Sequence, residues 1–181
     1  MIDVKNNFLD NILIGKIYNF YKLNVPSYKW RIVNYMDHFG HYRCGNCSGY
    51  VGMLILDEYN DELTDAYLTA YPQLKDMVDT FLFQIQVFQV GAEFVFHDDG
   101  LPYIFGSAIF LTREWDMDFG GLFLYEDENK ENKFVVPEYN RQVMNMRNDS
   151  GNLSRHAVST ITNQCEIPRV SIQVWGLKNG K

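Results

Sequence analysis

The sequence contains four histidines, and two of them stand in positions suited to holding a metal ion. His97 follows an apolar stretch and precedes Asp98 and Asp99 in the motif F-H-D-D-G. In an extended backbone alternate side chains share one face, so His97 and Asp99 can converge on one ion while Asp98 points away. A third candidate ligand is His156, which begins the predicted strand H-A-V-S-T-I. Together these residues offer two imidazoles and one carboxylate to a single metal.

Two histidines and one carboxylate form the facial triad of non-haem iron(II) oxygenases, which leaves coordination positions open for substrate and O2. A His-x-Asp triplet alone is common at the polar end of a strand, so other residues must support this interpretation. Arg169 opens a later predicted strand, R-V-S-I-Q-V-W, and Ser171 shares its face. A guanidinium fork pairs bidentately with a carboxylate, and a serine hydroxyl can donate to the same group. These two residues therefore predict a binding site for an anionic co-substrate beside the metal.

A second group of candidate ligands lies in residues 38–47, which read H-F-G-H-Y-R-C-G-N-C. His38, His41, Cys44 and Cys47 are all residue types that bind zinc, with two residues between each and the next. Structural zinc sites usually join two ligand pairs across a longer loop, and no thioredoxin-like pattern surrounds the C-x-x-C pair. A zinc site and a redox pair are two alternatives for this segment, and we prefer a polar loop near the mouth of a cavity.

The elements that must position these residues differ between the two parts of the chain. In the first part, apolar residues recur at helical spacing from Phe8 to Tyr21, with Asp10 as a cap. A buried strand follows at residues 49–56, and then a helical pattern over residues 57–80 that Pro72 interrupts. The second part alternates as short strands at residues 81–90, 93–97, 105–112, 121–126, 134–137, 142–146, 156–161 and 169–175. Short strands between polar turns are typical of a β-sandwich or jelly roll, with the helical part covering one sheet.

The composition favours a packed globular domain and argues against a helical bundle and against a protein that binds nucleic acid. The 181 residues are 46% hydrophobic and 22% charged, which is typical of a packed globular domain. The aromatic share of 15% favours strands and cavity walls over a helical bundle. A formal net charge of −7 argues against a surface that binds nucleic acid.

Targeting signals are also missing from the sequence pattern. No apolar run approaches the roughly 18 residues of a membrane span, no signal-peptide pattern is evident, and three cysteines do not make a disulfide scaffold. We therefore expect a cytoplasmic monomer or homodimer that contacts neither nucleic acid nor membrane. We expect residues 1–181 to form a single domain, in which residues 1–80 support a metal-bearing β core at residues 81–176.

In their order and spacing, the motifs of the second part resemble the Fe(II)- and 2-oxoglutarate-dependent oxygenases, on the prolyl-4-hydroxylase-like side. The resemblance covers roughly residues 82–176. It consists of F-H-D-D-G (96–100), F-L-T-R-E-W (110–115), G-G-L-F-L-Y (120–125), V-V-P-E-Y-N-R (135–141), R-H-A-V (155–158) and R-V-S-I-Q-V-W (169–175). It implies a mainly β fold, a double-stranded β-helix (jelly roll), with N-terminal supporting helices.

The same resemblance assigns roles to residues. His97, Asp99 and His156 would ligate Fe(II), and Arg169 would bind the C5 carboxylate of 2-oxoglutarate. Prolyl hydroxylases often place tyrosines near this carboxylate, and the matching positions here are Phe88 and Phe110. Ser171 or Tyr103 is therefore expected to supply the missing hydroxyl.

The implied activity is hydroxylation of an unactivated C–H bond in a peptidyl residue, with proline as one candidate, or in a small molecule. O2 and 2-oxoglutarate would be co-substrates, succinate and CO2 co-products, and ascorbate an additional cofactor. One alternative is a cupin-like jelly roll that binds a metal without oxygenase activity, in which Arg169 would have no use. Another is a structural zinc or redox protein centred on residues 38–47.

Overall fold

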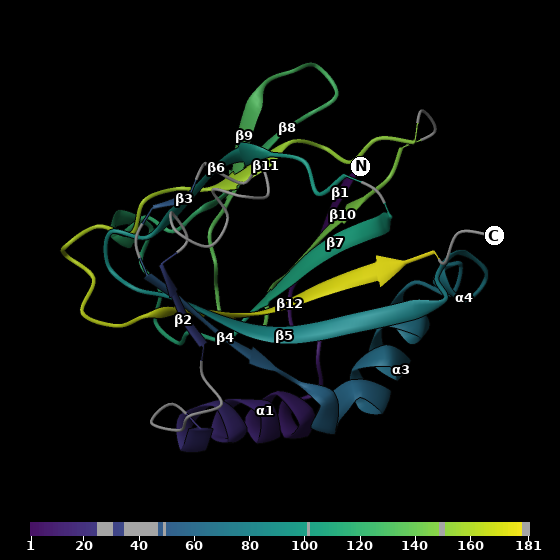
Figure 1. The fold of residues 1–181 in the computed structure, drawn as a ribbon, viewed down its shortest axis with the longest axis horizontal. Coiled ribbons are helices and arrows are strands. Elements are labelled where there is room, and N and C mark those ends of the chain that lie inside the picture. The colour runs from purple at the N-terminus through teal and green to yellow at the C-terminus, as the bar shows by residue number, and fades with distance from the viewer. Residues whose placement is uncertain (25–30, 35–46, 49, 101, 149–150, 179–181) are drawn as a thin grey trace.

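The computed structural model describes residues 1–24, 31–34, 47–48, 50–100, 102–148 and 151–178, and only the backbone of 31–34, 47–48 and 50. Its strands form two antiparallel sheets, with helices on the outer side of the larger one (Figure 1). This arrangement confirms the predicted mainly β jelly roll with N-terminal supporting helices. Among the described residues, no helix is both long and apolar enough to cross a membrane.

The larger sheet, called the major sheet below, has seven strands in the order β1-β10-β7-β12-β5-β4-β2. Their bounds are β1 Ile2–Lys5, β2 Arg31–Asn34, β4 Tyr50–Ile55, β5 Thr80–Phe88, β7 Tyr103–Phe110, β10 Gln142–Met146 and β12 Arg169–Leu177. The long strands β5 and β12 pair along their whole length, from Thr80 opposite Leu177 to Phe88 opposite Arg169. This pair forms the centre of the sheet.

The smaller sheet, called the minor sheet below, has five strands in the order β3-β6-β11-β8-β9. Their bounds are β3 Cys47–Ser48, β6 Glu93–His97, β8 Phe123–Glu126, β9 Asn132–Val135 and β11 His156–Val158. In Figure 1 it lies across the major sheet from the helices. The inner faces of the two sheets therefore enclose the space in which a site can form.

In the described part of the chain, three α-helices cover the outer face of the major sheet: α1 Asn11–Asn24, α3 Asn60–Ala70 and α4 Leu74–Met77 (Figure 1). The short 3₁₀ segments η1 Asp57–Tyr59 and η2 Met117–Phe119 complete the elements. As predicted, Asp10 caps α1, because its Oδ1 accepts hydrogen bonds from the amides of Ile12 (2.8 Å) and Leu13 (2.9 Å). Pro72 lies between α3 and α4 and separates the two helices.

Strand alternation divides the major sheet into two chemically different faces. Phe83, Ile85 and Val87 of β5 belong to the buried apolar cluster that includes the helices. Because side chains alternate, Gln84 and Gln86 point to the opposite face, toward the minor sheet. The apolar cluster fixes the register of these strands, since a slip of one residue would bring glutamines into the core.

Three strands of the structure were not predicted from the sequence. β1 is an edge strand whose four residues, I-D-V-K, pair with β10. Its residues alternate between apolar and charged, but a run of only four residues is a weak signal, and pairing with β10 holds it as a strand. The short strands β2 and β3 lie in a part of the chain that the sequence pattern left unassigned.

Candidate active site

A cavity of about 450 Å³ lies between the two sheets. Strands β4, β5, β7, β10 and β12 of the major sheet and β6, β8 and β11 of the minor sheet contribute residues to its wall. Most of the lining surface is apolar, and polar side chains from both sheets converge on it, which is the usual chemistry of a ligand site.

Burial along β5 and β12 shows which end of this cavity is closed. On the inner face, Arg169 is fully buried and its strand neighbour Phe88 is 1% exposed. At the other end of the same two strands, Leu82 is 45% exposed and lies opposite the half-buried Trp175. The cavity therefore runs from a closed end at Phe88, against which the buried Arg169 lies, to an open end at Leu82 and Trp175.

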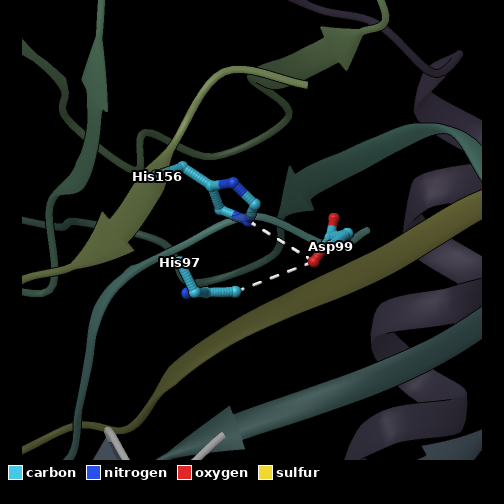
Figure 2. A group of neighbouring side chains, drawn as sticks. All are labelled: His97, Asp99 and His156. Carbon is cyan, nitrogen blue, oxygen red and sulfur yellow. Dashed lines mark ion pairs between the residues drawn. The ribbon is translucent and has the colours of Figure 1, made fainter. Parts of the chain in front are cut away.

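His97, Asp99 and His156 come together on the wall of this cavity, as the sequence predicted (Figure 2). Asp99 Oδ1 lies 3.7 Å from His97 Nε2 and 3.8 Å from His156 Nε2. The two histidines are direct partners across β6 and β11, so sheet pairing places both rings on one side. Asp98 is outside this cluster, as predicted, although it also lines the cavity.

Hydrogen bonds to the other ring nitrogen orient both imidazoles. His97 Nδ1 donates to the carbonyl oxygen of Val95 at 2.8 Å, and His156 Nδ1 donates to that of Ser154 at 3.2 Å. With the proton on Nδ1, each Nε2 presents its lone pair toward Asp99. This is the tautomer that a metal ligand requires, and such outer contacts also fix the orientation of the ring.

Asn145 supports His156 from the neighbouring major sheet. Its Nδ2 donates to the carbonyl oxygen of Ser154 at 2.8 Å, and its Oδ1 accepts from the Ser154 amide at 3.1 Å. The side chain thus holds both backbone groups of the residue whose carbonyl orients His156. This link between the two sheets has no signal in the sequence pattern.

The protonation state of His156 also suits a metal ligand. Burial lowers the pKa of His156 below its ordinary value, and the nearby His97 lowers it further, while the carboxylate of Asp99 opposes the shift. The neutral ring, which alone can bind a metal, is therefore the favoured form at neutral pH.

Gly106 gives Asp99 the room that it occupies. A Cβ atom at position 106 would lie 2.5 Å from Asp99 Oδ2, closer than any stable contact. We expect Gly106→Ala to displace the carboxylate and to weaken metal binding by about 10- to 100-fold, as for lost supporting contacts at metal sites. Mn(II) titration followed by electron paramagnetic resonance measures this affinity. Gly15→Ala is the matched control, because nothing lies within 4 Å of a Cβ there, and an unchanged affinity in Gly106→Ala would contradict the prediction.

Arg169 brings an unpaired positive charge to the closed end. Its guanidinium lies against the rings of Phe88 and Phe110, with Cζ at 5.1 and 5.0 Å from their centroids. None of its three nitrogens has a hydrogen-bond partner among the described residues, and burial lowers the pKa of Arg169 to about 9. A buried charge without a partner is costly, so a carboxylate ligand would complete this site. Gly121 leaves space here, because a Cβ at that position would lie 2.9 Å from Arg169 Cδ.

Comparison with known proteins shows which solved structures share this fold. No protein-family model and no curated protein matches the sequence. A prolyl-4-hydroxylase from Pseudomonas putida matches the structure with a TM-score of 0.77 and 13% sequence identity, over 98% of this chain and 92% of that chain. The chain has the fold of the 2-oxoglutarate and iron(II) oxygenases. The predicted resemblance to prolyl-4-hydroxylases is thereby confirmed at the level of the fold.

Two further structures support the same 2-oxoglutarate oxygenase fold. A prolyl hydroxylase from Trichoplax adhaerens, solved with a peptide fragment of the hypoxia-inducible factor oxygen degradation domain, matches with a TM-score of 0.72 and 13% identity, over 97% of this chain and 83% of that chain. An oxidoreductase of the 2OG-Fe(II) oxygenase family from Burkholderia pseudomallei matches with a TM-score of 0.63 and 16% identity, over 99% and 86% of the two chains.

Within this oxygenase fold, the structure distinguishes between the two hydroxyls expected to assist Arg169. Ser171 follows Arg169 on the inner face of β12 and is fully buried, and its Oγ accepts a hydrogen bond from Gln173 Nε2 at 3.2 Å. Its own proton is thus available to a ligand. Tyr103 pairs with Leu177 at the opposite end of β12. Tyr103 therefore lines the open end, and Ser171 is the hydroxyl near Arg169.

Arg147 holds the segment that follows the metal ligands. Its guanidinium donates to the carbonyl oxygens of Tyr103 (2.6 Å), Gly100 (2.7 Å) and Gly151. The carbonyls of Gly100 and Tyr103 fix the connection between Asp99 and β7, and that of Gly151 ties the segment after β10 to the same side chain. The loop carbonyls that Arg147 binds could not be inferred from sequence spacing.

Most of the candidate zinc or redox group at residues 38–47 lies outside the described residues. His38, His41 and Cys44 lie outside the described residues, and Cys47 is described only by its backbone. The zinc and redox interpretations therefore stay predictions.

Proposed function

We propose that this chain is an Fe(II)- and 2-oxoglutarate-dependent dioxygenase. It would hydroxylate an unactivated C–H bond of a peptidyl residue or of a small molecule, with succinate and CO2 as co-products. The observation that carries the proposal is that a His-Asp-His group lines one cavity, and a buried, unpaired guanidinium lies against Phe88 of the same lining. We also propose that residues 1–181 act as one oxygenase domain, since the cavity takes residues from both sheets.

The residues present fit the two groups that such a reaction needs. His97, Asp99 and His156 would hold the iron through two Nε2 atoms and one carboxylate oxygen. Arg169 and Ser171 would bind the distal carboxylate of 2-oxoglutarate at the closed end. Iron(II), 2-oxoglutarate and O2 together supply the oxidising chemistry that converts C–H to C–OH.

The rest of the chain's contribution is positioning and exclusion of water. Phe88, Phe94, Phe123 and Val158 line the cavity with apolar surface near the histidines. Such walls keep water away from reactive groups and strengthen the charge interactions inside. The open end at Leu82 and Trp175 admits the substrate, and the walls hold its C–H bond near the metal position.

A direct test combines metal, co-substrate and O2 in sequence. We expect an anaerobic titration of the protein with Fe(II) and 2-oxoglutarate to produce a metal-to-ligand absorption band. Admission of O2 should then release succinate, slowly without substrate and faster with one. Folded protein that shows neither the band nor succinate would exclude the oxygenase function.

The competing jelly-roll metal-binding function predicts a different result. It would give a bound metal but no dependence on 2-oxoglutarate. It also leaves the buried charge of Arg169 without a ligand, which is why we favour the oxygenase.

A further inference from the structure

Three glutamines form a continuous group on the inner face of the major sheet. Gln84 of β5 lies directly opposite Gln173 of β12, and Gln86 lies one step deeper on β5, opposite Ser171. All three line the cavity between the closed end and the open end. Carboxamides are rare choices for the wall of a buried space, because each must satisfy two donors and an acceptor.

The hydrogen bonds of these glutamines are incomplete among the described residues. Gln84 Nε2 donates only to the sulfur of Met53 at 3.7 Å, and Gln173 Nε2 donates to Ser171 Oγ at 3.2 Å. Gln86 is 5% exposed, and its carboxamide has no partner in the described chain. None of their carboxamide atoms is among the fully buried side-chain atoms that lack a partner, so these groups face the cavity and can complete their hydrogen bonds with a molecule that enters it.

The charges around the glutamines restrict what that ligand is. Among the described residues that line the cavity there is no lysine or arginine, and the carboxylates are Asp98 and Asp99. Asp99 belongs to the metal group, and Arg169 lies beyond the glutamines at the closed end. A second anion in the open half would therefore meet the negative charge of Asp98 but no positively charged side chain of the described lining.

We propose, on the basis of the oxygenase function above, that Gln84, Gln86 and Gln173 form a carboxamide subsite for a neutral amide group of the molecule to be oxidised. An amide donates and accepts at once and so matches facing carboxamides, whereas an ionised carboxylate only accepts. The preferred substrates are accordingly uncharged amides, such as an internal peptide segment or a carboxamide, and not the corresponding free acids.

The test compares matched probes in the intact protein loaded with Mn(II) and 2-oxoglutarate. The probes are N-acetylprolinamide, N-acetylproline and the methyl ester of N-acetylproline, which differ only in the terminal group. The amide both donates and accepts hydrogen bonds, the ionised acid is charged, and the ester only accepts. Broadening of the probe's NMR signals by Mn(II) gives its affinity and shows that it binds near the metal. We expect the amide to bind about tenfold tighter than the acid, with the ester between them.

Variants then assign this preference to the glutamines. Gln84→Leu combined with Gln173→Leu should reduce the preference for the amide to about twofold or less, since leucine keeps the volume but not the hydrogen bonds. Gln89→Leu is the matched control, because Gln89 is exposed at the end of the same strand, and it should keep the full preference. A preference that survives in the double variant, equal binding of amide and acid, or no binding of the amide at millimolar concentration would overturn the proposal.

The outcomes also separate this proposal from the proposed function. Binding of 2-oxoglutarate that depends on Arg169, without an amide preference, would disprove the subsite and leave the oxygenase standing. An amide preference measured with Mn(II) alone, in protein that does not bind 2-oxoglutarate, would support the subsite and disprove the oxygenase.

Discussion

An Asp99→Ala variant is expected to lose its metal and all succinate formation while keeping its fold. Asp99 Oδ1 is the shared neighbour of both histidine Nε2 atoms, at 3.7 and 3.8 Å, and it is the only carboxylate of the described metal group. Its removal leaves two neutral imidazoles and no negative charge to offset a divalent ion. We expect metal affinity to fall by more than about 100-fold, beyond the loss produced by supporting contacts alone.

Asp98→Ala is the matched control for this experiment, because Asp98 is the adjacent carboxylate on the same cavity wall but lies outside the metal group. Metal content after dialysis and succinate formed per protein measure both variants, and urea unfolding checks the fold. Asp98→Ala should keep its metal. Full turnover in Asp99→Ala would refute the assignment of the triad.

The metal group could be predicted from the sequence because local geometry determines most of it. His97 and Asp99 share a face through the alternation of an extended backbone, and a short sequence motif is sufficient to show this. His156 was predicted as a ligand from its place at the head of a strand and from the order of the motifs, whereas its direct pairing with His97 across β6 and β11 is seen only in the structure. The helix at α1 followed in the same way from its apolar spacing and the cap at Asp10.

The residues that support this group could not be predicted, because they act through contacts between distant strands. Gly106 matters only because β7 passes beneath Asp99, whereas a glycine within a strand more often marks a bulge or a sharp bend. Asn145 acts through the backbone of Ser154 on the far side of the cavity. The open-end position of Tyr103 depends on the register between β7 and β12, which the sequence does not reveal.

An Arg169→Met variant is expected to be more stable than the wild-type protein without ligand, yet unable to bind 2-oxoglutarate. Because burial lowers the pKa of Arg169 to about 9, the charged form is the one that folding disfavours. Below that pH the folded protein carries the full cost of burying the charged guanidinium, and this cost diminishes only as pH rises above about 9. At pH 7 we therefore expect methionine to raise the free energy of unfolding, measured in urea, by about 2–4 kcal/mol. Contacts with Phe88 and Phe110 offset part of the wild-type cost.

When 2-oxoglutarate is present, Arg169→Met should instead be at a disadvantage to the wild-type protein, because it cannot bind this co-substrate. Loss of a buried partner for a carboxylate costs about 2–5 kcal/mol in binding, so the affinity for 2-oxoglutarate should fall about 100-fold. Stabilisation of the metal-loaded protein by 2-oxoglutarate, clear in the wild type, should disappear. Arg113→Met is the control, since Arg113 is exposed and stacks on Tyr18 and Tyr139 away from the cavity. A merely structural Arg169 would give the reverse pattern, lower stability with 2-oxoglutarate binding retained, so the two measurements together decide whether this buried charge is kept for a ligand.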